Sequence, residues 1–211
     1  MNAGETTNFI FKIENASFST QDIKYINSLF VKRKEKLSRD IRSRIKAIYE
    51  RNGKLLFFST QKQIFSNNLI LIDSLLPQIL ASVLLQFASS NYSSIEDLIK
   101  ITEEENPLQF DISNKHLFYS YKIKRFLTDI ALGMMPSKVW TGEYDATGGY
   151  LIVKADGEVL CYHIYNKNEF ENYLLANTKL EMASSTRHKF GELYEENEEL
   201  FFKLNLQIRF K

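Results

Sequence analysis

The chain has 211 residues, of which 44% are hydrophobic and 25% charged, a balance typical of a globular domain and not of a disordered segment. Its net charge of +1 excludes a global field strong enough to draw the protein to DNA or to an acidic membrane. The single cysteine excludes an internal disulfide and a cysteine-based zinc site, and it indicates a reduced, cytoplasmic setting.

The first fifty residues are predicted to form a short strand over residues 9–13 and then one long helix. Ser19 with Asp22 resembles a capping box, and apolar residues then recur near helical spacing as far as Ile48. The apolar positions are Ile23, Ile26, Phe30, Leu37, Ile41, Ile45 and Ile48. The opposite, solvent-facing side would hold the basic residues Lys32, Arg33, Lys36, Arg39 and Arg42. Charged helix faces are usually only solvated, so this basic face is a weak indication of a polyanion site.

The middle of the chain is predicted to be helical after a strand over residues 54–59. Residues 67–88 form an apolar helix that Pro77 interrupts. Its core, residues 69–87, contains Asp73 and Gln78, and such groups cost roughly 2–3 kcal/mol each at a bilayer centre. We therefore expect a buried core helix and no membrane span. Further helices are expected from Ser93 to the residue before Asn106, and over residues 115–132.

After Pro136 the pattern changes to that of a sheet. Strands are expected at residues 139–140, 150–154 and 159–165, the last two joined by a turn at Asp156-Gly157, and a short helix follows Asn166. Residues 201–210 alternate as one half-buried strand. The prediction is an α+β fold with a helical N-terminal half and a mixed, largely antiparallel sheet in the C-terminal half. We divide it into a mainly helical region, 1–135, and a sheet-rich region, 136–211.

Signals for catalysis are weak. Cys161 and His163 share a strand face, but a cysteine among alternating apolar residues is usually core filling. A metal-dependent nuclease needs carboxylates around Mg²⁺ and a nearby lysine, usually as an Asp followed by an acid two residues before a Lys. Asp145 and Lys154 are suitably spaced and Glu158 follows the turn, but Ile152 stands where the acid is needed. These three are weak catalytic candidates, and Asp145 is a weak metal ligand; the alternative is a solvated hairpin.

The end of the chain is more informative. Ser185, Thr186, Arg187 and His188 place hydroxyls, a guanidinium and an imidazole in one loop; Arg187 could bind a guanine edge and the hydroxyls could bind phosphate oxygens. The polar positions of the last strand are Lys203, Asn205, Gln207 and Arg209, side chains of the kinds that contact bases or phosphates. An ordinary solvated strand face explains the same pattern equally well. We expect these eight residues to bind nucleic acid.

Several longer stretches together resemble the HpaII family of type II restriction endonucleases. They are Phe126-Leu-Thr-Asp-Ile-Ala-Leu-Gly-Met, Lys138-Val-Trp, Tyr144-Asp-Ala-Thr-Gly-Gly-Tyr, Cys161-Tyr-His-Ile-Tyr-Asn, Phe170-Glu-Asn-Tyr-Leu-Leu, Ser185-Thr-Arg-His with Phe190-Gly, and Lys203-Leu-Asn-Leu-Gln-Ile-Arg-Phe, with Asn68-Leu-Ile-Leu-Ile-Asp and Glu103-Glu-Glu-Asn-Pro-Leu earlier. The resemblance implies a Mg²⁺-dependent enzyme that cuts both strands of a short palindromic DNA site, typified by CCGG, beside a methyltransferase that protects the host.

The resemblance also implies that family members extend further at the N-terminus. Asn2-Ala-Gly-Glu-Thr-Thr-Asn-Phe resembles a segment just after their Ser-Ile-Lys-Ser-like motif, the best candidate for the catalytic lysine strand. That motif would fall before Met1, so no catalytic residue is transferred to this chain.

Three functions stay open. The chain is a target-recognition and scaffold part of a restriction nuclease, an active nuclease using Asp145, Lys154 and Glu158 with Mg²⁺, or a DNA- or protein-binding module without nuclease activity. A palindromic target suits a two-fold homodimer, but a monomer cutting the strands in turn also fits.

Overall fold

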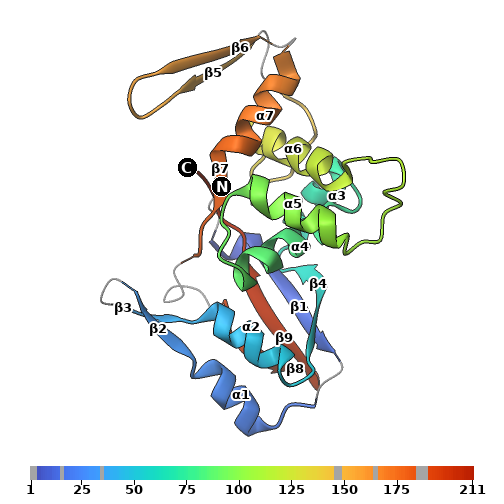
Figure 1. Ribbon diagram of the computed structural model, residues 1–211, viewed down its shortest axis with the longest axis vertical. Helices are drawn as coiled ribbons and strands as arrows, with labels where there is room; N and C mark the ends of the chain where they lie inside the picture. The colour runs from blue at the N-terminus through green and yellow to red at the C-terminus, as the bar shows by residue number, and fades with distance from the viewer. Residues whose placement is uncertain (1–3, 15–16, 34–35, 145–148, 164–165, 184–189) are drawn as a thin grey trace.

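The computed structural model describes the chain except residues 1–3, 15–16, 34–35, 145–148, 164–165 and 184–189. Its centre is a four-stranded antiparallel sheet in the order β4-β1-β9-β8 (Figure 1). These strands are β1 (Asn8–Glu14), β4 (Lys54–Thr60), β8 (Leu193–Glu196) and β9 (Glu199–Asn205). The predicted α+β class is confirmed. The division at residue 135 stays a prediction, and the sheet takes strands from both sides of it.

One face of the central sheet is part of the main core. Phe9 and Phe11 of β1 pair with Leu204 and Phe202 of β9, and all four side chains are buried. Because side chains alternate along a strand, these four point to the same face. That face packs against helices that follow in sequence. The helices are α1 (Thr20–Asn27), α2 (Ile41–Tyr49), α3 (Gln63–Ile72), α4 (Leu76–Ser89), α5 (Ile95–Glu105) and α6 (Phe118–Ala131).

The predicted apolar helix is two helices. α3 ends at Ile72 and α4 begins at Leu76, with Pro77 in its first turn, where the missing amide hydrogen costs nothing. Leu69, Leu80 and Leu84 are buried in the core. Among the described residues no single helix is long and apolar enough to cross a membrane; α3 and α4 reach that length and composition only together, with a bend of 106° between them.

The single long helix predicted from Ser19 to about Ile48 is wrong. Its first part is α1, which begins with the predicted capping box of Ser19 and Asp22. A hairpin of β2 (Phe30–Arg33) and β3 (Lys36–Arg39) follows, and the amide of Asp40 donates to the carbonyl of Leu29 (3.1 Å) across its base. α2 then starts afresh, with Asp40 accepting from the amide of Ser43 (3.2 Å). The basic residues therefore lie on a hairpin and a separate short helix instead of one helical stripe.

The C-terminal half contains two smaller antiparallel pairs. β5 (Gly149–Val153) and β6 (Val159–His163) form the predicted hairpin, which extends away from the body (Figure 1). α7 (Lys167–Asn177) leads into β7 (Thr178–Leu180), which pairs with β10 (Ile208–Phe210). The strand predicted at residues 139–140 is wrong, because Asn68 holds this segment as a loop: its amide donates to the carbonyl of Lys138 (2.8 Å) and accepts from the amide of Trp140 (3.0 Å).

Candidate nucleic-acid interface

The polar row predicted on the last strand is not a single solvent-facing row. The strand breaks between β9 and β10, and Asn205 and Gln207 are buried at the break. The Asn205 amide donates to Asn8 Oδ1 (2.6 Å) and to the carbonyl of Gly4 (2.8 Å). These partners lie near the start of the chain, so no pattern local to residues 201–210 could reveal them. The DNA contact predicted for Asn205 and Gln207 stays a prediction, but their described surroundings are protein.

The two cations of the row lie on different sheets. Lys203 is half-buried on β9, where its ammonium is 5.1 Å from the centroid of the Tyr194 ring. Arg209 is exposed on β10, and its Nε is 3.2 Å from Glu181 Oε2. An exposed ion pair of this kind is weak, so a phosphate oxygen could replace the carboxylate as the partner of Arg209.

The predicted loop residues Ser185, Thr186, Arg187 and His188 lie outside the described residues. The chain on both sides is described, and it is firmly held. Before the loop, Ala183 is buried next to the β7–β10 pair. After it, the Phe190 carbonyl accepts from Arg39 Nη1 (3.3 Å). The loop therefore leaves from the β7 side and returns beside the basic β2–β3 hairpin.

Gly191 fixes the return of this loop to two further elements. Its amide donates to the carbonyl of Lys203 (2.5 Å), and its carbonyl accepts from Nη1 of Arg44 (2.5 Å). Arg44 has no exposed surface, and it also donates to the carbonyls of Asn27 and Leu29 (the latter 3.1 Å). Burial lowers the pKa of its guanidinium to about 10, so it stays charged at neutral pH. A buried cation thus links the hairpin, α2 and the end of the predicted loop.

A polar groove of about 270 Å³ lies where the chain approaches the loop from β7. Arg42 at the start of α2 forms one wall and donates to the carbonyl of Ser90 and the side chain of Asn91. Lys179 and Glu181 of the β7 side form the other wall. The remaining lining residues are Phe87, Ser90, Asn91, Tyr92, Ser93, Leu180 and Met182.

The groove is rigidly built and its chemistry suits a phosphate backbone. The amide of Leu180 donates to the carbonyl of Ser93 (2.8 Å), and a β-bridge joins Ser94 to Lys179. The β7 wall is therefore hydrogen-bonded to the 90–94 segment, to which Arg42 of the other wall also donates. Two cations, serine hydroxyls and an amide are the groups that contact DNA phosphates. Glu181 is the opposing charge, and Arg209 partly neutralises it. We take this groove, with the adjoining ends of the 184–189 segment, as the candidate interface.

The residues that line this groove come from separate segments of the sequence, and only some of them could be predicted as binding residues. Arg42 was among the basic residues predicted on a helix face, whereas Lys179 and Asn91 were not singled out. The polar run 89–94 between two apolar helices was the available local sign, and only the fold brings it against β7.

The weak catalytic candidates do not form a described site. Asp145 lies outside the described residues. Lys154 and Glu158 form an exposed ion pair across the hairpin turn, and the hydrogen bond that Lys154 donates to Glu158 raises the pKa of Lys154. The amide of Glu158 binds Asp156 Oδ1 (3.0 Å), as expected of a solvated turn. Within the described part of the chain, no three His, Cys, Asp or Glu side chains gather where they could hold a metal ion.

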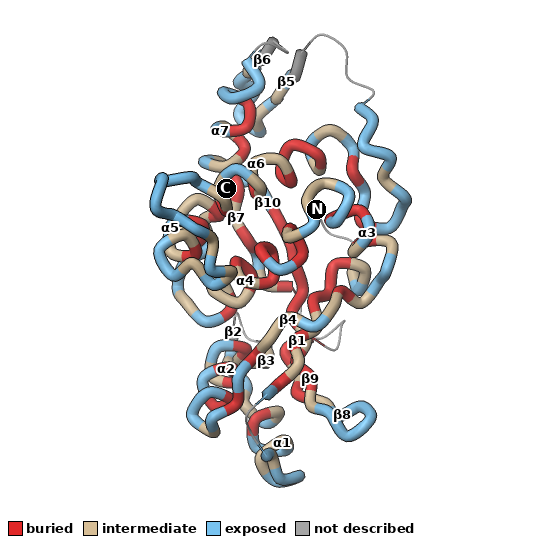
Figure 2. The backbone as a smooth tube through the Cα atoms, turned by 90° about the vertical axis from the view of Figure 1, so that its right-hand side faces the viewer, coloured by how far each residue is buried: buried red, intermediate tan, exposed pale blue. Residues whose placement is uncertain are grey.

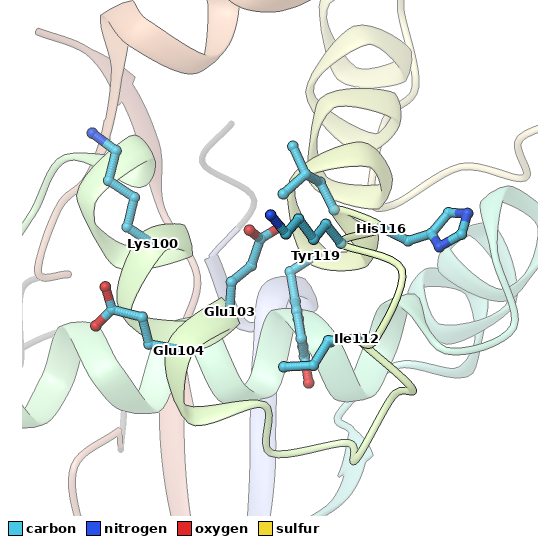
Figure 3. Close-up of a pocket in the computed structure, with 8 residues that line it drawn as sticks. Lys100, Glu103, Glu104, Ile112, His116 and Tyr119 are labelled. Atoms are coloured by element: carbon cyan, nitrogen blue, oxygen red, sulfur yellow. The ribbon is translucent and has the colours of Figure 1, made fainter.

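Another surface pocket, of about 360 Å³, lies between α5 and the loop before α6 (Figure 3). Glu103 accepts from the amide of Ser120 (2.9 Å), and Lys100 pairs with Glu96 (3.3 Å). Figure 3 shows the imidazole of His116 directed away from the carboxylates of Glu103 and Glu104. These side chains do not form an acid–base pair, so the pocket is not a catalytic candidate.

One buried carboxylate was missed by the sequence-based prediction. Asp129 of α6 is 2% exposed and accepts a hydrogen bond from the hydroxyl of Tyr144. Burial raises the pKa of Asp129, and the Tyr144 hydrogen bond opposes that rise. Tyr144 immediately precedes residue 145, so Asp129 anchors the chain that enters the segment bearing the predicted metal ligand. No local pattern indicated it, because an Asp in a helical pattern is normally exposed.

Comparison with known proteins gives two matches that cover essentially the whole chain. A family model described as HpaII restriction endonuclease matches residues 1–210. The chain is 50% identical over 210 residues to the protein described as type II restriction enzyme HpaII from Haemophilus parainfluenzae, an alignment that covers 100% of this chain and 56% of that protein. The chain thus spans about half the length of the curated relative it matches. No solved structure matches it.

Proposed function

Because this chain belongs to the HpaII restriction endonuclease family, we propose that it binds duplex DNA and supplies target recognition and scaffold for cleavage at a short palindrome of the CCGG kind. The observation that carries this proposal is the 50% identity to a type II restriction enzyme along the whole chain. Duplex DNA inside the cell would be its substrate, which would place the protein in the cytoplasm beside a protecting methyltransferase.

We assign recognition and not strand cleavage to the described residues for a chemical reason. Restriction enzymes of this class generally use Mg²⁺, which needs several oxygen ligands held together. The described part of the chain does not fit that need, since Lys154 and Glu158 pair only with each other on an exposed turn and no carboxylate group of three is formed. We therefore assign no catalytic step to the described residues. Asp145 stays a predicted ligand, and an active nuclease built on it stays the alternative.

The polar groove supports DNA binding through the phosphate backbone. Arg42 and Lys179 would contact phosphates from its two walls, with Ser90 and Ser93 as hydroxyl donors. Such contacts set affinity and register but contain no sequence information. Arg209 would join them by exchanging Glu181 for a phosphate oxygen.

The 184–189 segment would contact the base edges and so recognise the DNA sequence, because its residue types suit such contacts. A guanidinium binds the O6 and N7 edge of guanine bidentately, and CCGG presents guanines on both strands. Arg187 would read one of them, with Ser185, Thr186 and His188 as neighbouring donors. A two-fold palindrome also suits a homodimer that presents this segment twice.

The test is affinity for matched duplexes that contain CCGG or a scrambled site, measured by fluorescence anisotropy. We expect Arg187→Ala to reduce the preference for the CCGG duplex by about 1–3 kcal/mol. Arg42→Ala should weaken binding to both duplexes equally, since it removes a phosphate contact. Unchanged discrimination in Arg187→Ala would contradict base reading by this residue.

Cleavage of a CCGG-containing plasmid with Mg²⁺ separates the alternatives. We expect the chain alone to bind without cutting. Cutting that Asp145→Asn abolishes would instead establish the active-nuclease alternative. Failure to bind any duplex at low salt would favour a protein-binding module.

A further inference from the structure

The central sheet has a second face that is apolar and outside the main core. It consists of the residues that alternate with the core-facing ones: Ile10, Leu56, Phe58, Tyr194 and Phe201, which we call the outer aromatic face. Phe201 lies between Phe58, whose ring is tilted against it (5.3 Å between centroids), and Tyr194, whose ring stacks on it (5.7 Å). None of the five belongs to the core cluster or packs against it. The sheet therefore has two separate hydrophobic groups, one on each face.

A bulge in the sheet presents the most exposed member. The register of β1 and β4 shifts between Ile10 and Phe11, which leaves Phe58 unpaired on the β4 side. Its side chain is 58% exposed, whereas Phe201 beside it is 6% exposed. Phe201 contacts the Phe58 ring on one side, and more than half of Phe58 stays exposed, so Phe58 can contact a further apolar partner.

The outer aromatic face has no α-helical cover among the described residues. In Figure 2, α1 and α2 lie on one side of β1, β9 and β8. On the other side the short 3-10 helix Gly4–Thr7 covers the end of the sheet at Asn8 and Asn205, where Gly4 and Thr7 accept hydrogen bonds from the Asn205 amide. Half-covered antiparallel sheets normally carry polar side chains on the open face. On this face the charged side chains lie beside the aromatic ones: Lys12 pairs with Glu199 (2.6 Å), and Lys203 lies over the Tyr194 ring. An aromatic centre with a charged rim is the composition of a protein–protein interface.

We propose that the outer aromatic face is the docking surface for the portion of an HpaII-type enzyme that this chain does not match, the portion that brings the hydrolytic groups. This inference rests on the proposed function, because it assigns recognition to this chain and hydrolysis to that portion. The alignment covers 56% of the Haemophilus parainfluenzae enzyme, so more than a third of that enzyme is available as the occupant.

The position of the face favours this occupant over an unrelated partner. The carbonyl of Lys203, a residue on the same face, accepts a hydrogen bond from the amide of Gly191. Gly191 lies two residues after the 184–189 segment. A body seated on the outer aromatic face would thus be next to the segment proposed to read DNA. Hydrolytic groups must reach the same short site that is being read, so the two portions need this adjacency.

The test uses this full chain and, as a separate tagged polypeptide, the unmatched portion of the Haemophilus parainfluenzae enzyme. We expect the two to co-purify after co-expression. Phe58→Lys should weaken the complex by about tenfold or more, because it puts a charge at the centre of a desolvated contact. Leu117→Lys is the matched control: Leu117 is similarly exposed (61%) at the start of α6, and its replacement should leave the complex intact.

A second readout covers the case in which the separate portion is insoluble. A photo-crosslinking amino acid in place of Phe58 should link to the co-expressed portion in cells, whereas the same group in place of Leu117 should not. Equal crosslinking at both positions, or an intact complex with Phe58→Lys, would overturn the proposal.

The remaining outcomes separate this inference from the proposed function. A dimer of this chain alone that Phe58→Lys dissociates in sedimentation experiments would assign the face to a second copy and overturn the docking proposal. DNA affinity of Phe58→Lys is measured alongside and should equal that of the unsubstituted chain. DNA binding without complex formation would refute docking alone, whereas complex formation without DNA binding would refute the proposed recognition role alone.

Discussion

Arg44 and Gly191 are joined by a 2.5 Å hydrogen bond from the buried guanidinium to the carbonyl, across 147 positions of the sequence. This bond ties α2 to the chain that returns from the proposed DNA-reading segment. Because the same guanidinium also binds the carbonyls of Asn27 and Leu29, one side chain satisfies three backbone acceptors at the junction of hairpin, helix and sheet.

Arg44→Ala should therefore destabilise the fold by about 3–5 kcal/mol, since it leaves several carbonyls without partners and opens a cavity. The measurement is urea unfolding followed by circular dichroism. Lys46→Ala on the same helix is the control, because Lys46 is exposed and should cost less than about 0.5 kcal/mol. Equal midpoints for the two variants would show that Arg44 does not hold this junction.

Gly191→Ala should destabilise the protein more than Gly157→Ala. Both glycines have positive φ, +69° and +87°, so both substitutions incur backbone strain of about 1 kcal/mol. A methyl group on Gly191 would also overlap the side chain of Ile41, whereas one on Gly157 would meet open space. The difference between the two unfolding free energies isolates the crowding, which we expect to add about 1–3 kcal/mol. No difference would mean that Ile41 yields without cost.

Asn68→Ala should release the loop that contains Trp140. The substitution removes the bonds to the carbonyl of Lys138 and the amide of Trp140, and we expect a loss of about 2 kcal/mol. Trp140 is the only tryptophan, so its fluorescence reports on this loop directly, and its emission should shift to the red. Asn67→Ala, one position away and bonded only to Gln63 in the described contacts, should change neither quantity. An unshifted emission in Asn68→Ala would contradict the role of Asn68.

Asp129→Asn should alter the pH dependence of stability. Burial raises the pKa of Asp129 above its ordinary value of 3.8, so the folded protein holds this proton more tightly than the unfolded chain. Wild-type stability is therefore lost as pH rises from 3.8 through the folded pKa. The uncharged variant avoids this loss, and its stability relative to wild type should rise from pH 4 to pH 7.

Asp111 provides a control of opposite sign. A hydrogen bond from Ser113 lowers the pKa of Asp111, so its contribution is present at neutral pH and is lost as pH falls through the folded pKa. Asp111→Asn should thus lose stability relative to wild type as pH rises from the folded pKa to about 3.8, and should change little relative to wild type from pH 4 to pH 7. Parallel pH profiles for the two variants would contradict both assignments.

The sequence predicted best those features that depend on near neighbours. The capping box of Ser19 and the turn at Asp156-Gly157 each rest on residues within a few positions, and each is present. The interruption predicted at Pro77 lies a few residues earlier, between Ile72 and Leu76. The alternation of Phe202 and Leu204 also identified the core face of β9 correctly.

The failures have a common physical cause, which is bonding between distant segments. The periodicity of residues 23–48 could not show that Arg44 would bind the carbonyl of Leu29 and so require a chain reversal. Asn205 looked solvent-facing by alternation, but its partners Gly4 and Asn8 lie at the other end of the chain. The groove escaped prediction in the same way, because Arg42 and Lys179 meet only through the fold.

If this chain binds DNA through the groove walls, the salt dependence of its affinity will report those phosphate contacts. Each phosphate contact contributes about one unit to the slope of log affinity against log salt concentration. We predict that Arg42→Ala and Lys179→Ala each weaken binding to every duplex and each reduce that slope by about one, whereas Lys100→Ala, exposed and outside the groove, leaves it unchanged. Slopes that are identical in all four proteins would show that the groove walls do not contact DNA phosphates.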